Sequence, residues 1–349
     1  MPCDSSRALK RRVPPSLWIG AIAAGWLVLI SGLHFQFNIE PPPKNVLRMG
    51  YMPVISNLAC PLLDYATREG NGIRFESLKF SSFAEMGEAL RNGHIQAAFI
   101  IAPLSIVLRQ QGADVKVVYI GNRHESTLVI RRDLQINDFG GLTGKKIAIP
   151  MRYSGHNIAT RRLAEQFRIG AGGIDIVEMN PPDMPSALAT GVLDAYFVGE
   201  PFAAQTIRAD KSRVLYHVEE IWPGFICNLL LVKQDFIQKY PEQVQMLVQG
   251  AARSGYWANQ NIREAAHIAS LYWNQPRDLI EFALDHPKNR VVFDRFVPKE
   301  KELQFLADQM YYFKLLDHTR IPGLVEDRFA LASNLEGISD LKSIVAAKP

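Results

Sequence analysis

Short apolar runs alternate with amphipathic stretches between residues 46 and 217. The apolar runs predict strands at residues 46–52, 72–80, 97–101, 115–120, 128–131, 146–149, 174–178, 195–198 and 214–217. The amphipathic stretches predict helices at residues 58–69, 83–91, 104–111, 157–167, 184–190 and 202–209. Strands and helices that alternate at this spacing predict α/β units with mainly parallel sheets.

The pattern changes after an apolar strand at residues 229–232. Helical periodicity then predicts helices at residues 235–240, 241–261, 262–274, 276–285 and 303–316. Pro241 and Pro276 take first-turn positions, where the missing backbone N–H does no harm. We expect this helical extension to fold back on the first half of the body.

An internal repeat indicates that the body has two similar halves. Residues 86–103 align with residues 184–201. The alternative to a true repeat is a chance match combined with the sequence pattern that all α/β units share. In both copies a glycine follows a predicted helix, where a left-handed residue ends it, and a proline opens the next helix. The identical pairs are Met86/Met184, Ala89/Ala187, Leu90/Leu188, Gly93/Gly191, Ala97/Ala195, Phe99/Phe197 and Pro103/Pro201.

A real repeat predicts a two-lobed clamp whose chain crosses twice between the lobes. We expect the crossovers near residues 125–128 and 222–228. Residues 46–125 and 228–349 would then form lobe I, and residues 126–227 would form lobe II.

The N-terminal segment decides the compartment. Four basic residues lie within residues 1–12, and residues 17–33 are uncharged and close to the length that spans a bilayer. The run ends without the small residues of a signal-peptidase site. We predict a basic cytoplasmic flank at 1–12, an uncleaved membrane anchor within 13–38 and a proline-rich linker at 39–45. The alternative is a cleaved signal peptide, and both place the body on the periplasmic side of the cytoplasmic membrane.

Composition and charge limit the classes of partner and cofactor that we expect. The apolar fraction of 48% and the charged fraction of 21% are typical of a globular protein. The net charge of +4 is concentrated in the N-terminal flank, so we expect no nucleic-acid partner. Cys3, Cys60 and Cys227 lack the spacing of a metal site, and we expect no metal or cofactor. Cys60 and Cys227 are either a disulfide or two buried thiols.

Polar residues follow the predicted strands where an α/β sheet binds its ligands. Free N–H groups at helix starts attract anions and polar groups there. His156 either faces this cleft or packs at a helix start, and Glu200 either binds ligand or complements a helix dipole. Trp222 is an aromatic wall or a core residue. The predicted ligand-binding residues are Ser56, Asn57, Ser82, Ser105, His124, Ser154, Gly155, His156, Asn157, Glu200 and Trp222.

Motifs of common enzymes are absent from the sequence. It contains no G-x-S-x-G elbow, no H-E-x-x-H helix and no phosphate-binding P-loop. We therefore predict a binding protein and not an enzyme. A membrane-tethered ligand sensor is the second hypothesis, and an enzyme built on the same fold is the third.

Several motifs resemble one family of binding proteins. Residues 180–184 (Asn-Pro-Pro-Asp-Met) and 191–201 (Gly-Val-Leu-Asp-Ala-Tyr-Phe-Val-Gly-Glu-Pro) are similar to motifs of the nitrate/bicarbonate/alkanesulfonate/taurine-type solute-binding proteins of ABC transporters. Residues 154–157 (Ser-Gly-His-Asn) and 220–223 (Glu-Ile-Trp-Pro) resemble the nitrate- and bicarbonate-binding branch. The resemblance covers about residues 46–273.

The resemblance implies a type II periplasmic-binding-protein fold. It also implies capture of a small molecule between the lobes and delivery to an ABC permease and ATPase. Phe202 stands where the nitrate branch usually has tryptophan, and residues 224–228 contain no lysine. The ligand is therefore left open among an oxyanion, a sulfonate and a neutral metabolite.

Overall fold

The computed structural model describes residues 15–38, 45–69 and 72–345. Residues 47–349 form one compact body, and the residues before them form a separate unit. The predicted basic flank at 1–12 and the prolines of the predicted linker at 41–43 lie outside the described residues.

Helix α1 (Pro15–Asn38) contains the apolar run of the N-terminal segment. Trp18, Trp26 and Leu27 are among its exposed side chains. Within the described ranges, no helix combines the length and the hydropathy needed to cross a membrane. The predicted transmembrane anchor therefore finds no support in the structure.

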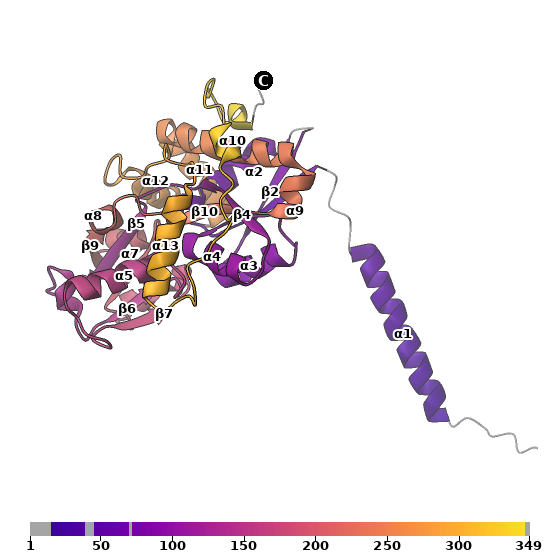
Figure 1. Ribbon diagram of the computed structural model, residues 1–349, viewed down its shortest axis with the longest axis horizontal. Helices are drawn as coiled ribbons and strands as arrows, with labels where there is room; N and C mark the ends of the chain where they lie inside the picture. Colours follow the sequence, from indigo (N-terminus) through magenta and orange to yellow (C-terminus); the bar gives the residue numbers. More distant parts are fainter. Residues whose placement is uncertain (1–14, 39–44, 70–71, 346–349) are drawn as a thin grey trace, which may run out of the picture. The chain divides into compact units, whose positions relative to one another are not determined.

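The described body contains two five-stranded sheets, with orders β2-β1-β3-β10-β4 and β7-β6-β8-β5-β9 (Figure 1). We call the part built on the first sheet lobe I and the part built on the second lobe II. Each predicted strand is present, with ends that differ by at most two residues. The strands are β1 (Val46–Tyr51), β2 (Arg74–Lys79), β3 (Ala97–Ile101), β4 (Val115–Ile120), β5 (Ser126–Arg131), β6 (Lys146–Ile149), β7 (Asp175–Glu178), β8 (Ala195–Gly199), β9 (Ser212–His217) and β10 (Asn228–Lys233).

One inner strand in each sheet runs against its neighbours. β10 pairs antiparallel with β3 and β4, and β5 pairs antiparallel with β8 and β9. The prediction of mainly parallel sheets was wrong at these positions. The reason is that the chain enters β5 and β10 directly from the other lobe. Each strand therefore starts where its neighbour ends, so that Ser126 lies opposite Gly199 and Asn228 opposite Ile101.

Helices cover both sheets. The helices have one apolar and one polar face. Side-chain caps fix the first residues of several helices; at the start of α3, for example, the Ser82 side chain accepts a hydrogen bond from the Glu85 N–H. Lobe I carries η1 (Ile55–Asn57), α2 (Ala59–Thr67), α3 (Phe83–Arg91) and α4 (Ala102–Gln110). Lobe II carries η2 (Phe139–Leu142), α5 (Gly155–Gln166), η3 (Pro181–Asp183), α6 (Met184–Ala189), α7 (Phe202–Arg208) and α8 (Val218–Ile221).

The internal repeat places one copy in each lobe. The α3–β3–α4 unit of lobe I corresponds to the α6–β8–α7 unit of lobe II. β3 and β8 occupy equivalent central positions in their sheets. Gly93 and Gly191 have φ angles of 77° and 79°, the left-handed conformation that ends a helix. The predicted assignment of the two units to separate lobes is confirmed.

The C-terminal helices pack mainly on lobe I, as predicted (Figure 1). Leu247 and Ala251 share a core with Leu62 and Leu63 of α2, while α13 packs against α4. The extension also reaches lobe II, where Arg208 of α7 pairs with Asp278 at 2.6 Å. These helices are α9 (Gln234–Lys239), α10 (Pro241–Gln260), α11 (Ile262–Trp273), α12 (Arg277–Asp285), α13 (Glu300–Tyr312), α14 (Arg328–Leu331) and η4 (Lys342–Val345).

A continuous apolar cluster joins the lobes. Met52 and Val54 of lobe I belong to the same buried cluster as Ile158 and Phe202 of lobe II. Removing apolar surface from water is favourable by roughly 25 cal/mol per Å². Hydrophobic contact therefore stabilises the closed arrangement of the lobes.

We predict that Gly93→Ala and Gly191→Ala each lower the free energy of unfolding by about 1 kcal/mol, because alanine is strained at positive φ. The added Cβ itself meets only a side-chain nitrogen at ordinary contact distance, 3.7 Å at Gly93 and 3.6 Å at Gly191. Urea unfolding measures the effect. Gly170→Ala is the control, since Gly170 is exposed and has open space around it. Equal stability of all three variants would contradict the backbone argument.

Candidate functional site

The lobes meet where β3 and β8 end and where β10 and β5 begin. η1 follows β1 at this interface, and α5 follows β6. The predicted residues Ser56, Asn57, Ser154 and His156 are each at most 2% exposed. The structure therefore buries polar side chains of both predicted loops.

Glu125 links both lobes from the first crossover. Its Oε1 accepts a hydrogen bond from Ser56 Oγ at 3.0 Å, and its Oε2 accepts from the Glu200 N–H at 2.7 Å. A direct bond adds to this contact, because the Ile55 N–H donates to the Glu200 carbonyl at 2.8 Å. One carboxylate thus holds η1 of lobe I against the start of α7 in lobe II.

Glu200 caps α7 and faces a buried cation. Its Oε1 accepts from Thr127 Oγ1 at 2.8 Å, and its Oε2 accepts from the Ala204 N–H at 2.8 Å. Arg290 Nη1 lies 3.8 Å from Oε1. This geometry agrees with the helix-dipole alternative for Glu200, and ligand contact by Glu200 stays a prediction.

Arg290 was not predicted. It is 7% exposed, its Nε donates to Glu219 at 2.9 Å, and its Nη2 donates to the Ser126 carbonyl. Within the described structure its Nη1 has no hydrogen-bond acceptor. Arg290 lies in the irregular segment after α12, where no periodicity distinguishes a buried arginine from a solvated one.

His156 lies inside lobe II at the start of α5. Its ring packs edge-on against Phe197 and Phe225, with centroids 5.1 and 5.5 Å away. Nε2 lies 3.0 Å from Ser126 Oγ, and Nδ1 has no partner among the described residues. Burial lowers the pKa of His156 to about 3, so the imidazole is neutral at physiological pH.

The Ser126–His156 contact has the spacing of a nucleophile and its base. A histidine with so low a pKa is a weak base, and both side chains are sealed from solvent. His156 Nδ1 also lacks the carboxylate that orients such a base. The pair therefore suits packing and hydrogen bonding better than nucleophilic catalysis.

Three asparagines extend the cluster. Asn57 Nδ2 donates to the Met52 carbonyl at 2.8 Å, and Asn228 Nδ2 donates to Asn57 Oδ1 at 2.8 Å. Asn122 is 1% exposed, yet neither polar atom of its side chain has a partner in the described structure. Buried polar groups are usually satisfied, so both the amide N–H groups and the amide oxygen of Asn122 have unused hydrogen-bonding capacity.

The two crossovers are bonded to each other. His124, with φ of 66°, accepts at Nε2 from the Gly224 N–H at 2.9 Å, and Arg123 Nη1 donates to the Gly224 carbonyl at 2.6 Å. Burial and the nearby Arg295 lower the pKa of His124 to about 4. His124 therefore connects the crossovers.

The other predicted residues have structural contacts. Ser154 caps α5 by accepting from the Asn157 N–H at 3.1 Å, and Asn157 Nδ2 donates to the Arg152 carbonyl at 2.7 Å. Gly155 approaches the Phe225 ring closely. Ser105 donates to the Ala102 carbonyl within α4 at 2.6 Å, and Ser82 caps α3. Ligand contact by these residues stays a prediction.

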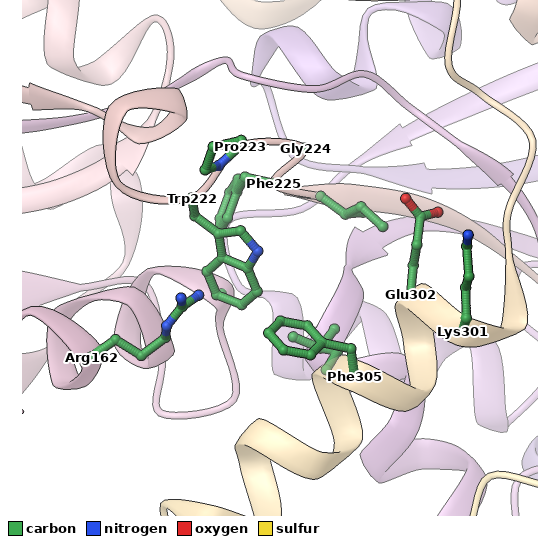
Figure 2. A pocket seen from close by; sticks show the side chains of 11 residues that line it. Arg162, Trp222, Pro223, Gly224, Phe225, Lys301, Glu302 and Phe305 are labelled. Carbon is green, nitrogen blue, oxygen red and sulfur yellow. The ribbon is translucent and has the colours of Figure 1, made fainter.

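Trp222 lies in the wall of a cavity of about 480 Å³ beside the second crossover (Figure 2). Its indole packs edge-on against Phe225 and Phe305, and the guanidinium of Arg162 lies 4.8 Å from its ring centroid. Arg162 was not predicted either. The remaining lining residues are Gly155, Pro223, Gly224, Ile226, Lys301, Glu302 and Leu306.

Buried charge dominates the electrostatics of the interlobe cluster. Burial raises the pKa of Glu125 to about 7, and the Glu200 carboxylate contributes to the rise. Burial also raises the pKa of Glu200, while the Arg290 cation opposes that rise.

Comparison with known proteins gives a consistent result. The model of the NMT1-like family matches residues 40–272. The taurine-binding periplasmic protein of Escherichia coli is 27% identical over 199 residues, which cover 55% of this chain and 60% of that protein's length.

Solved structures share the fold. The ligand-binding component of an ABC-type import system from Staphylococcus aureus, solved with zinc bound, superposes with a TM-score of 0.75 at 21% identity and covers 84% of this chain and all of that one. The nitrate-binding protein NrtA of Synechocystis has a TM-score of 0.72 at 14% identity, with 84% and 89% covered. Among the residues described, no cluster of three histidine, cysteine or acidic side chains could hold a metal ion.

We predict that Glu125→Gln gains stability relative to wild type as pH rises from about 5 to 8. A folded-state pKa above the ordinary value means that ionisation of Glu125 destabilises the folded protein above about pH 4.5, with the full cost reached above about pH 7. Glutamine removes this cost, which we expect to be about 2–3 kcal/mol. Urea unfolding of the body at both pH values measures the difference.

The measured quantity is the free energy of unfolding of the variant minus that of wild type at each pH. This difference cancels the contribution of the buried histidines, whose lowered pKa values change stability with pH in the opposite direction. Glu264→Gln is the matched control, because Glu264 is an exposed glutamate on α11. A Glu125→Gln difference that stays constant with pH would show that Glu125 is ionised at no cost.

Proposed function

The chain belongs to the NMT1-like family, and on that premise we propose that it is the extracytoplasmic solute-binding protein of an ABC-type importer. The observation that supports this most is the polar cluster that joins two similar lobes through Glu125, Ser56 and Glu200. A ligand placed between η1 and α5 can form hydrogen bonds with the same groups that bond across the interface in this structure, and so replace those interlobe bonds. Taurine binding and nitrate binding, the functions of two similar proteins, agree with this role.

In the proposed mechanism the lobes bend apart at the two crossovers and close on a small molecule. Opening exposes the interlobe contacts of Ile55 and Ser56, and closing with ligand restores equivalent bonds. Asn122 and His156 Nδ1 supply hydrogen-bonding groups that have no partner within the described part of the chain. The proposed lobes comprise residues 46–125 with 228–349, and residues 126–227.

The charges of the cluster favour a small zwitterion. The Glu200 carboxylate, and Glu125 where it is ionised, repel a bare anion such as nitrate but can accept from an ammonium group. Arg290 and the free N–H groups at the start of α5 can bind the anionic end. Taurine has both groups, so we propose a taurine-like amino sulfonate or amino acid as ligand. We propose binding without chemical conversion, because the Ser126–His156 pair lacks an effective base.

The N-terminal segment belongs to the same proposal. We infer that the uncharged apolar face of α1 and the basic flank before it direct export and keep the protein at the membrane. The permease and ATPase of an importer would then receive the ligand at the periplasmic face.

We predict that His156→Ala weakens taurine binding by about 5- to 150-fold, equivalent to the 1–3 kcal/mol lost when a buried polar partner is unmatched. Calorimetric titration of the body with taurine and nitrate measures this. His94→Ala is the control, since His94 is exposed. If the His156→Ala variant binds taurine with wild-type affinity, His156 has only a packing role. Absence of binding by wild type, with uptake unaffected by gene deletion, would contradict the importer function.

We predict that the full-length protein is recovered with the membrane fraction and is accessible to protease from the periplasm. The physical reason is the exposed apolar surface of α1, which water disfavours. Cell fractionation with N-terminal sequencing tests it. Soluble protein that begins near residue 36 or later would instead identify the segment as a removed signal.

A further inference from the structure

The cavity beside Trp222 shares Gly155 and Trp222 with the predicted ligand-binding residues, but Glu125, Glu200 and Arg290 do not line it. Its walls come from α5, from crossover residues 222–226 and from α13 (Figure 2). Its volume of about 480 Å³ falls within the range of small-molecule pockets, about 300–1,000 Å³. Three separate segments of the chain therefore enclose a space large enough for a small ligand.

Aromatic rings form one side of the cavity. Trp222 is edge-on to Phe225 at 5.5 Å and to Phe305 at 5.9 Å. Phe305 remains 44% exposed although it packs on Trp222. A flat apolar molecule that covers this ring would remove apolar surface from water and complete the aromatic cluster.

Positive charge dominates the remaining wall. Within the described residues Arg162 has no ion pair, and in Figure 2 its guanidinium is directed toward the Trp222 ring. The nearby carboxylates are engaged, because Glu302 pairs with Arg123 at 3.1 Å and Glu165 accepts from Tyr312 at 3.1 Å.

Lys301 adds a second cation on α13. A half-buried guanidinium beside apolar rings is the arrangement that binds a carboxylate with two parallel hydrogen bonds. The wall is therefore suited to an anionic group and unsuited to a cation.

We propose that this cavity binds an organic anion with a flat apolar body, with the carboxylate at Arg162 and the ring against Phe225 and Phe305. The site is distinct from the Glu125, Glu200 and Arg290 cluster proposed for solute capture and does not depend on it. A ligand there contacts α5 of lobe II and α13, which packs on lobe I. Occupancy therefore holds the two lobes together at the second crossover.

Calorimetric titration of the full-length protein with 2-naphthoate tests the proposal, with neutral 2-naphthamide as the uncharged comparison. We expect the acid to bind more tightly than the amide. Arg162→Gln should weaken 2-naphthoate about 10- to 100-fold and leave 2-naphthamide unchanged. Lys301→Gln, a surface change, should weaken binding of the acid by a smaller factor and make that binding less sensitive to salt.

Matched controls separate the site from general effects. Arg152 lies 4.8 Å from the Tyr153 ring centroid, the same geometry outside the cavity, so Arg152→Gln should bind 2-naphthoate like wild type. Phe305→Leu should weaken both probes, whereas Tyr311→Leu, exposed on the same helix, should weaken neither. Circular dichroism confirms that each variant is folded.

Three results would overturn the proposal. They are absence of 2-naphthoate binding by wild type at millimolar concentration, equal affinity of acid and amide, and equal affinity of Arg162→Gln and Arg152→Gln. None of them affects taurine binding by the interlobe loops, so failure here and failure of the proposed function are distinguishable.

Discussion

The hydrogen bonds of the Glu125 carboxylate join elements that are far apart in sequence and belong to different lobes. Ser56 reaches it from lobe I, and the Glu200 backbone reaches it from lobe II. Because Glu125 is on the crossover itself, the lobes are held together at the point about which they would turn. Burying a carboxylate there is costly, and the raised pKa of Glu125 measures that cost.

The cost is tolerable because apolar contact accompanies it. Met52, Val54, Ile158 and Phe202 form one buried cluster across the same interface. Hydrophobic contact favours closed lobes but is not directional, whereas the hydrogen bonds of the polar cluster fix the relative orientation of the groups that they join. A ligand that matches the polar groups would gain from a closure that the apolar cluster already favours.

Much of the fold could be predicted from sequence because each strand and helix is set by local periodicity. The repeat of residues 86–103 at 184–201 further identified two lobes, since Gly93 and Gly191 both need a left-handed conformation. The reversed direction of β5 and β10 could not be predicted, because it depends on which lobe the chain leaves.

The site was only partly predictable. Ser56, Ser154 and His156 follow strands, and strand ends face the interface by geometry. Arg290 lies in an irregular segment, and Arg162 lies in the second turn of a helix. Local sequence at these positions does not indicate their contacts, which are formed with residues distant in the chain. Predicting them would need the three-dimensional path of the C-terminal extension.

The pairing at the crossovers has a mechanical consequence. Arg123 forms single-residue antiparallel bridges with both Ile226 and Val292, so three chain segments pair in a narrow ribbon at the crossovers. Such a ribbon bends readily about an axis within its plane but resists sliding, because sliding would break its backbone hydrogen bonds. We expect the relative motion of the lobes to have close to one degree of freedom. The segment that carries Arg290 joins this ribbon through Val292, so we expect bending of the ribbon to move the buried guanidinium as well.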